Sequence, residues 1–407
     1  MQNQKRENLL NLALSATDEE RERSENLDVG YDPEERTWEL IVRHSGSLAG
    51  LAGAGIQVDE LLNGYAVLVV PEHLVDQVSE LNQIEYIEKP KRLFFASNMA
   101  RAASCLSVVQ SPSGTGNVTG GVISGLSGGL TGRGVLVAVI DSGIDYLNQD
   151  FRNEDGSTRI LMLMDQDRGR IYTREEINEA LDAPDRAGAL ERVPSVDLSG
   201  HGTAVAAIAA GNGRGSQGVY RGVAYESDLL VVKLGAPVAD NFPRTTQLMK
   251  GLDFVIRQAQ ELGRPVAVNL SFGNTYGSHD GTSLLETFMN DISNYGRSVL
   301  VAGTGNEGTG NGHTAGRLVM GSDTDVELSI APFETGMGVQ LWKSYVDAFA
   351  IRLITPSGGS IGPIDSRLGP QTLNYGGTRI LIYYGKPSPY SKAQEVYFDF
   401  IPIRDYL

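Results

Sequence analysis

The stretch from Val135 to Asp145 constrains the fold more than any other part of the chain. It opens with six apolar residues, 135–140, rich in β-branched side chains and too short to cross a membrane. Such a run is typical of a strand buried on both faces of a parallel sheet. Its first polar residue is Asp141, and in open α/β sheets functional groups lie just beyond the carboxyl ends of strands. Asp141 is therefore a candidate site residue.

Strand and helix patterns alternate from this run to about residue 303. The apolar spacing predicts strands over 135–140, 228–234, 265–271 and 297–302, and helices from 201, over 245–262 and over 283–295. The charged region 165–196 shows no regular pattern. An alternation of this kind is typical of a parallel sheet with helices on both faces. We therefore expect an α/β domain here.

Residues 1–96 have the pattern of a small α+β unit of ferredoxin-like order. Strands are predicted over 38–44, 56–61, 65–70 and 84–88, with a helix over 71–82. The pair Asn63-Gly64 is a hairpin signal between the second and third strands. Residues 1–30 are charge-dense, which predicts a frayed arm or an exposed helix. The unit ends in a basic and aromatic tail, Lys89 to Phe95, which we expect to be extended.

After about residue 314 the pattern changes to short strand-like runs separated by Gly, Pro and Ser turns. The runs lie at 326–330, 337–341, 349–354, 378–384 and 395–401. No helical pattern intervenes, so we expect an all-β sandwich or jelly roll. The predicted domains are 1–96, a Gly-rich and Ser-rich linker and arm over 97–134, the α/β domain over 135–315, and an incomplete β-domain over 316–407.

Composition excludes some classes of function. The chain has 34 Lys and Arg against 50 Asp and Glu, a net charge of −16, which argues against a nucleic-acid partner. No apolar run approaches the roughly 18 residues of a membrane span, and the first 26 residues lack the apolar core of a signal peptide. The single cysteine, Cys105, cannot form an internal disulfide, which fits a reducing compartment.

Three polar side chains follow strands or begin helices in the predicted α/β domain. Asp141 ends one strand, His201 begins a helix, and the Gly-flanked Asn306 follows the strand over 297–302. A carboxylate, an imidazole and an amide suit acyl transfer, because the carboxylate fixes the tautomer of the imidazole and the amide donates to the developing oxyanion. No residue cluster has the spacing of metal ligands, so we assign no metal and no cofactor.

These stretches resemble the motifs of the subtilisin-like serine proteases. The resemblance rests on Val-Ile-Asp-Ser-Gly-Ile-Asp at 139–145, Gly-His-Gly-Thr-Ala-Val-Ala at 200–206, Gly-Asn-Glu-Gly at 305–308 and Ala-Val-Asn-Leu-Ser-Phe-Gly at 267–273. It implies catalytic roles for Asp141 and His201 and an oxyanion hole at Asn306. It also implies substrate binding by residues of two segments: Leu270, Ser271, Phe272, Gly273, and Gly303, Thr304, Gly305.

Within that family the chain is similar to the clostridial spore-germination (Csp) proteases. Shared features are the tail at 86–92, the segments 150–156 and 277–283, and a β-domain after Asn306. The resemblance implies a subtilisin-like parallel sheet, an α+β ferredoxin-like propeptide before it and a jelly-roll-like insertion. It further implies a spore protein, made in the cytoplasm, whose substrate is the precursor of a cortex-degrading hydrolase. The propeptide would occupy the active-site cleft until cleavage near Phe95, Ala96 and Ser97.

The serine nucleophile is missing from the expected place. The Gly-Thr-Ser at 281–283 lies before Asn306, and Leu-Leu-Glu follows it in place of small residues. We interpret Ser283 as a helix N-cap. Two hypotheses remain open. The chain is part of a longer serine endopeptidase, a zymogen whose nucleophile lies beyond Leu407, or it is an inactive pseudoprotease that acts as a regulator or binding partner in germination.

Overall fold

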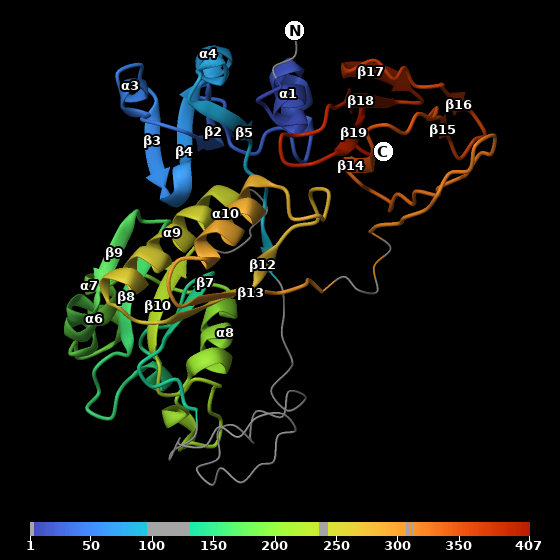
Figure 1. The fold of residues 1–407 in the computed structure, drawn as a ribbon. Coiled ribbons are helices and arrows are strands. Elements are labelled where there is room, and N and C mark those ends of the chain that lie inside the picture. Colours follow the sequence, from blue (N-terminus) through green and yellow to red (C-terminus); the bar gives the residue numbers. More distant parts are fainter. Residues whose placement is uncertain (1–3, 96–129, 236–242, 307–309, 311) are drawn as a thin grey trace, which may run out of the picture. The chain divides into compact units, whose positions relative to one another are not determined.

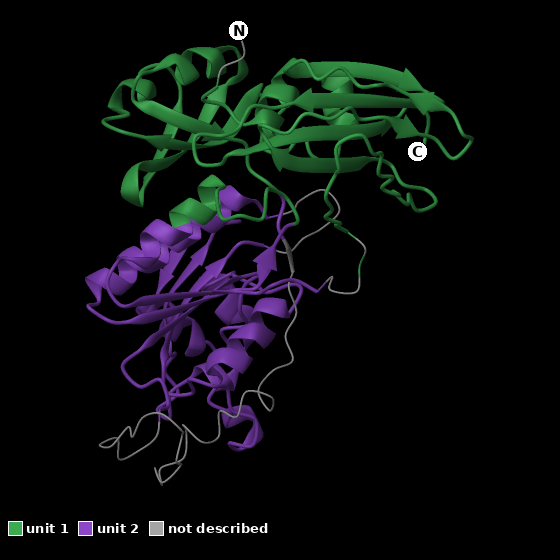
Figure 2. Cartoon of the chain, turned by 45° about the vertical axis from the view of Figure 1, so that its right-hand side comes forward, with its two compact units in different colours: residues 1–91, 275–288, 309–407 green, residues 92–274, 289–308 purple. Residues whose placement is uncertain are grey.

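The computed structural model describes residues 4–95, 130–235, 243–306, 310 and 312–407. The chain divides into two compact units, neither of which is continuous in sequence (Figure 2). Unit 1 comprises Met1–Lys91, Thr275–Phe288 and Thr309–Leu407, and unit 2 comprises Arg92–Asn274 and Met289–Gly308. Cys105 and most of the predicted linker lie outside the described residues.

Unit 2 contains the predicted α/β sheet. Its strand order is β13-β11-β7-β10-β8-β9, and every neighbouring pair is parallel except β8 with β9. The strands are β7 Leu136–Asp141, β8 Ile160–Asp165, β9 Arg170–Thr173, β10 Asp228–Lys233, β11 Val266–Leu270 and β13 Ser298–Ala302. All six residues of β7 are buried, as the apolar run predicts. The predicted strands therefore form one sheet, with β7 near its centre.

Helices cover both faces of this sheet, with α8 (His201–Ala210) and α9 (Thr245–Glu261) on opposite sides (Figure 1). Val137 and Val139 of β7 share a core with Val205 of α8. On the other face α9 approaches so closely that a Cβ at Gly251 would lie 3.4 Å from the side chain of Ile140. The expectation of helices on both faces is confirmed.

The region 165–196 is more regular than the sequence suggested. It holds strand β9 and two short helices, α6 (Arg174–Leu181) and α7 (Arg186–Arg192). Thr173 caps α6 together with Glu176 in a reciprocal capping box, and Asp185 caps α7. These capping residues could have predicted the starts of α6 and α7 from the sequence, but the high local charge obscured them.

Two elements of unit 2 expose apolar side chains that such elements normally bury. Helix α8 is apolar on nearly every side, yet Ile208 is 47% exposed. Strand β13 ends the described sheet, and Val299 and Val301 are 59% and 53% exposed. A helix that is apolar all round and a strand without a polar face are typical of the interior of a domain.

Unit 1 contains the predicted ferredoxin-like arrangement. Strands β5, β2, β4 and β3 lie side by side in that order and pair antiparallel. The elements in chain order are β1 Tyr31–Asp32, β2 Thr37–His44, α3 Ala49–Ala52, β3 Gln57–Leu61, β4 Tyr65–Pro71, α4 Val75–Glu80 and β5 Ile84–Glu88. Asn63 and Gly64 have positive φ angles of 61° and 72°, as the predicted hairpin requires.

The expectation of a frayed or exposed arm over residues 1–30 is wrong. The arm forms helices α1 (Asn8–Ser15) and α2 (Asp18–Arg23). The buried residues of α1 are Leu9, Leu10, Leu12 and Ala13. They lie in one hydrophobic core with Trp38 of β2 and with Tyr397 from the C-terminal part of the chain. The partners that bury the arm are remote in sequence, so its local charge density was misleading.

The C-terminal residues of unit 1 form an antiparallel sheet in the order β14-β19-β18-β17, with a two-stranded ribbon, β15 and β16. Their bounds are β14 Met337–Ser344, β15 Leu353–Ile354, β16 Ser360–Ile361, β17 Gly369–Tyr375, β18 Thr378–Tyr384 and β19 Ala393–Pro402. The run 326–330 forms no strand, which corrects that expectation, and β17 was not predicted. The jelly roll stays a prediction.

Candidate active site

Asp141 and His201 form a hydrogen-bonded pair at the carboxyl end of β7, in which Asp141 is buried and His201 is partly exposed. Asp141 is the last residue of β7 and is 0% exposed, and His201 is the first residue of α8. The distance from Asp141 Oδ1 to His201 Nδ1 is 2.7 Å. The backbone N–H of Ser142 donates to the same oxygen, also at 2.7 Å. Asp141 therefore accepts a hydrogen bond from Nδ1–H, which leaves Nε2 as the basic nitrogen of the neutral ring.

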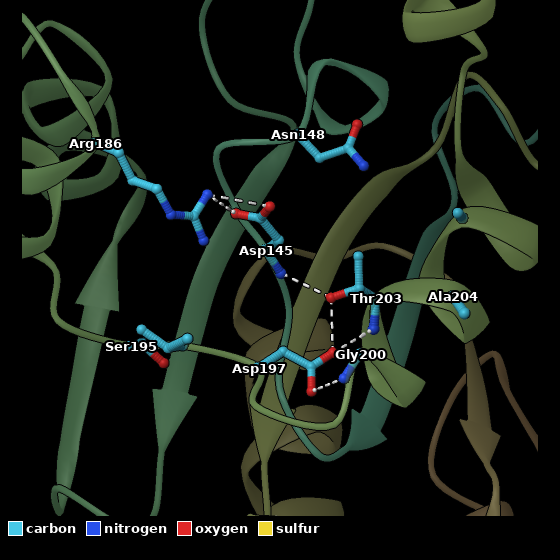
Figure 3. Close-up of a pocket in the computed structure, with 10 residues that line it drawn as sticks. Asp145, Asn148, Arg186, Ser195, Asp197, Gly200, Thr203 and Ala204 are labelled. Carbon is cyan, nitrogen blue, oxygen red and sulfur yellow. Dashed lines mark hydrogen bonds and ion pairs between the residues drawn. The ribbon is translucent and has the colours of Figure 1, made fainter.

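Asp197 fixes the loop that carries His201 (Figure 3). Its Oδ2 accepts hydrogen bonds from the backbone N–H and the hydroxyl of Thr203, at 2.9 and 2.7 Å. Its Oδ1 accepts from the hydroxyl of Ser142 and from the N–H of Gly200, at 2.8 and 3.0 Å. Burial acts to raise the pKa of Asp197, but these hydrogen bonds outweigh it and hold the pKa below its usual value. Sequence reasoning missed Asp197, although it stands only four residues before His201 in the sequence.

Gly202 is required by the close approach of α8 to the end of β7. A Cβ at Gly202 would lie 2.2 Å from the carbonyl oxygen of Gly143 and 3.1 Å from the Cβ of Asp141. Its N–H donates to the hydroxyl of Ser142 at 2.9 Å. The glycine thus sets the separation between the two elements that carry Asp141 and His201.

We expect Gly202→Ala to push α8 away from β7 and to break the Asp141–His201 hydrogen bond. Overpacking of this kind costs about 1–3 kcal/mol of unfolding free energy, which urea denaturation followed by circular dichroism measures. Gly188→Ala is the matched control, since a Cβ in α7 meets its nearest atoms at 3.4 Å and alanine favours a helix. Equal stability of the two variants would contradict this role for Gly202.

The segment that follows β11 pairs with residues 94–95. Strand β12 (Phe272–Gly273) lies antiparallel to β6 (Phe94–Phe95), with Phe272 opposite Phe95. Just before β6, the N–H of Leu93 donates to the carbonyl of Pro243 at 2.7 Å. The backbones of Arg92 and Arg244 form an isolated antiparallel β-bridge. The tail is thus held by backbone pairing on two segments. The sequence indicated the pairing with residues 272–273. It gave no signal for the pairing with residues 243–244, because backbone partners need no particular side chain.

This pairing lies at the same edge of the sheet as the Asp141–His201 pair. Leu270, the last residue of β11, lies opposite Ile140 of the neighbouring strand β7, so β12 begins beside Asp141. On the other side of β11, Ala302 ends β13 and lies opposite Leu270. The predicted residues Gly303, Thr304, Gly305 and Asn306 follow β13 at this edge and are exposed. Ala96 and Ser97 of the predicted cleavage region lie outside the described residues.

Comparisons with known proteins agree with this geometry. Residues 4–91 match the Csp protease B prodomain, and residues 132–329 match the subtilase family. The solved CspB protease of Clostridium perfringens is 34% identical, with a TM-score of 0.64, over 68% of this chain and 59% of that one. The chain is a subtilase related to the Csp proteases. A curated subtilisin from Bacillus sp. (strain TA39) is 27% identical over 262 residues, 63% of this chain and 52% of its own length.

This subtilase chain therefore spans between half and three fifths of the length of both relatives. None of the helices in the described ranges is long and apolar enough to cross a bilayer. Within the same ranges, no group of three or more His, Cys, Asp or Glu side chains is placed to hold a metal ion.

Ser283 of this subtilase caps a helix, as the sequence indicated. Its hydroxyl donates to Glu286 Oε2 at 2.7 Å, and the N–H of Glu286 donates back to the hydroxyl at 3.3 Å. The arrangement is a capping box at the start of α10 (Leu284–Ser293). The hydroxyl proton is therefore committed to a carboxylate on its own helix.

We expect Ser283→Ala to lower stability without removing a nucleophile. Loss of an N-cap costs about 0.5–2 kcal/mol of unfolding free energy, and reactivity toward a serine-directed fluorophosphonate should stay unchanged in the complete gene product. Thermal unfolding and labelling, measured side by side with the wild type, test both parts. Loss of labelling in this variant would identify Ser283 as the nucleophile and overturn its assignment as a cap.

A cavity of about 390 Å³ adjoins the start of α8 in this subtilase (Figure 3). Arg186 extends toward Asp145 across it, with 3.3 Å between the guanidinium and the carboxylate. The backbone N–H of Asp145 donates to the hydroxyl of Thr203 at 2.9 Å. Arg186 and Asp145 thus pair with one another, and the hydroxyl of Thr203 joins the loop after β7 to the network of Asp197.

Proposed function

We propose that this chain is the greater part of a subtilisin-like serine endopeptidase that is made as a zymogen. The pairing of residues 94–95 with β12, at the edge of the sheet where Asp141 holds His201, is the observation that carries the proposal. An extended backbone laid along an exposed strand is the way a protease presents a peptide for cleavage. A tail held in this manner by its own chain is both an inhibitor and the first substrate.

Each side chain then has a role. Asp141 orients His201 and stabilises the imidazolium, and His201 acts as general base toward a serine hydroxyl. Asn306 donates its amide to the oxyanion. The backbone of 270–273 and of 303–305 binds the substrate, and cleavage of the propeptide falls at Phe95, Ala96 or Ser97. The propeptide itself extends over residues 1–96.

We propose that the serine nucleophile belongs to a segment of the complete gene product beyond residue 407. The exposed apolar faces of α8 and β13 support this, because a further layer of the domain would bury Ile208, Val299 and Val301. A helix packed on α8 would also carry a serine hydroxyl toward His201. The residues 316–407 would then be an insertion, of jelly-roll type, within the catalytic domain.

The physiological substrate and location follow from the resemblance to the Csp proteases. We propose a protein substrate, such as the precursor of a spore-cortex hydrolase, and packaging in the spore. The alternative is a pseudoprotease that regulates germination by binding. It is favoured by the one Gly-Thr-Ser of the chain, whose hydroxyl is engaged by Glu286.

Labelling by a fluorophosphonate separates the two functions. The complete gene product should be labelled at one serine beyond residue 407, and His201→Ala should remove the labelling because the serine then lacks its base. An exposed-histidine variant, His313→Ala, serves as the control. A folded protein that takes up no label would be the pseudoprotease.

A further inference from the structure

Strand β19 carries two acidic side chains on the face that packs against the N-terminal arm. Tyr397 and Ile401 belong to the core that contains Leu9 and Leu10 of α1, whereas alternate residues pack into the separate core of the sheet. Side chains of a strand alternate between its faces, so Glu395 and Asp399 lie on the same face as Tyr397. They are only 4% and 1% exposed.

Glu395 has uncharged hydrogen-bond donors. Asn8 of the arm donates to its Oε2 at 3.1 Å, and Gln340 of β14 donates to its Oε1 at 2.6 Å. The charges of Glu7 and Lys91, on other elements, act on it. Amide donors compensate a buried carboxylate only in part, because the full negative charge stays in a medium of low dielectric.

Two carboxyl groups contact one ammonium group beside Asn8, and the charge of that ammonium also acts on Glu395. Lys91 Nζ lies 2.7 Å from Glu7 Oε1 and 3.3 Å from Glu88 Oε2. The backbone N–H of Leu284 donates to the other oxygen of Glu88. With Glu7, Glu88 and Glu395 all ionised, three negative charges would face one positive charge. The phenols of Tyr86 and Tyr390 complete the group and stay neutral, because burial raises the pKa of both.

The negative charge of an ionised Asp399 would be compensated less well than that of Glu395. One oxygen accepts a hydrogen bond from the hydroxyl of Ser24, which follows α2. The other oxygen, Oδ1, is buried with no hydrogen-bond partner in the described part of the chain. The charged groups that face it are Glu25 and Asp28 from the arm and Lys89, whose ammonium donates to the carbonyl of Asn26. A protonated carboxyl suits this position better than a carboxylate.

The pKa values of these carboxyl groups agree with their buried positions. Burial, with the charge of Glu7 adding to it, raises the pKa of Glu395 to about 7. Burial also raises the pKa of Asp399 to about 7, and that of Glu88 to about 7 against the opposing charge of Lys91. Burial alone would lower the pKa of Lys91, but Glu7 and Glu88 outweigh it and raise that pKa, so the ammonium stays charged.

We propose that residues 7–27 and strand β19 form a joint that is closed while Glu395 and Asp399 carry protons and that opens when they ionise. The joint connects the N-terminal arm to the C-terminal sheet within unit 1. Neither the contacts nor the burial involves the Asp141–His201 pair, so the inference does not rest on proteolytic activity.

The direction of the effect follows from linkage. The folded state holds protons up to a pH of about 7, whereas an opened state releases them near pH 4, the usual range of Asp and Glu. The stabilisation is therefore complete below about pH 4 and is lost as the pH rises through about 7. Each ionising group changes the ratio of open to closed states up to tenfold per pH unit in this window.

Hydrogen exchange of the whole chain at pH 5.5 and pH 8.0 tests the joint. After correction for the intrinsic exchange rates, we expect protection of peptides from α1 and β19 to fall at least tenfold at the higher pH. Peptides from β7 and β10 in unit 2 should change less than twofold. Equal protection of α1 and β19 at both pH values in the wild type would overturn the proposal, whatever the behaviour of any variant.

The double variant Glu395→Gln and Asp399→Asn identifies the groups responsible. The amides imitate the protonated carboxyls, so the loss of protection between the two pH values should shrink to less than threefold. Asp347→Asn, at an exposed position of unit 1, should keep the full wild-type loss. A double variant that retains the wild-type pH dependence would overturn the assignment of the joint to these two carboxyls.

Discussion

Replacement of His201 by alanine in the complete gene product is expected to leave a folded protein that is not cut near residue 96. Asp141→Asn should give the same result, because an amide at this position no longer holds Nδ1 of His201 in its protonated form. The loss of a catalytic triad member slows such enzymes by roughly 10³–10⁶-fold, with residual activity from the oxyanion hole. Electrophoresis during expression and circular dichroism of the purified variants measure cutting and folding separately.

His313→Ala is the matched control, since His313 is exposed and belongs to no helix or strand. It should be cut like the wild type. Normal cutting of both His201→Ala and Asp141→Asn would show that another group activates the nucleophile.

Asp197→Asn is expected to have the second largest effect, on stability and on activity together. The carboxylate accepts hydrogen bonds from Thr203, Ser142 and Gly200. In the Asn variant an NH₂ group replaces one of the oxygens, and because NH₂ is itself a donor it cannot accept the hydrogen bonds made to that oxygen. Loss of a hydrogen bond to a charged group costs about 1.5–3 kcal/mol. We expect that decrease in unfolding free energy and a rate of processing roughly 10–100-fold lower, because His201 loses its fixed position.

The pH dependence of stability distinguishes this role from a simple packing defect. The pKa of Asp197 is lowered in the folded state, so its contribution is present above about pH 4 and is lost as the pH falls through the lower folded value. Urea denaturation from pH 7 down to pH 3 should therefore show the gap between wild type and Asp197→Asn closing in acid. A gap that stays constant over this range would contradict the role given to the carboxylate.

The sequence predicted the α/β sheet well because its signals are local. Each strand of unit 2 that it named is a short apolar run, and His201 begins α8 as expected. The candidate residues Asp141 and His201 come from different elements, and the structure brings them within hydrogen-bond distance, in line with the rule that functional groups follow strand ends. The role of Asn306 stays a prediction.

What failed depends on partners far away in sequence. Leu10 lies in a core formed by strands β2 and β4 and by residues of β18 and β19 several hundred residues later, so no local pattern distinguishes α1 from an exposed helix. Glu395 and Asp399 alternate with apolar residues as solvent-facing acids would, yet the arm covers them. The pairing of Leu93 with Pro243 is made by backbone atoms and leaves no trace in the side chains.

The intact mass of the complete gene product after expression tests the central claim most directly. A protease with Asp141 and His201 in the roles proposed here predicts a species that lacks about the first 96 residues, together with the released propeptide. A folded protein of uncut mass only would contradict that account and would make this subtilase a binding protein.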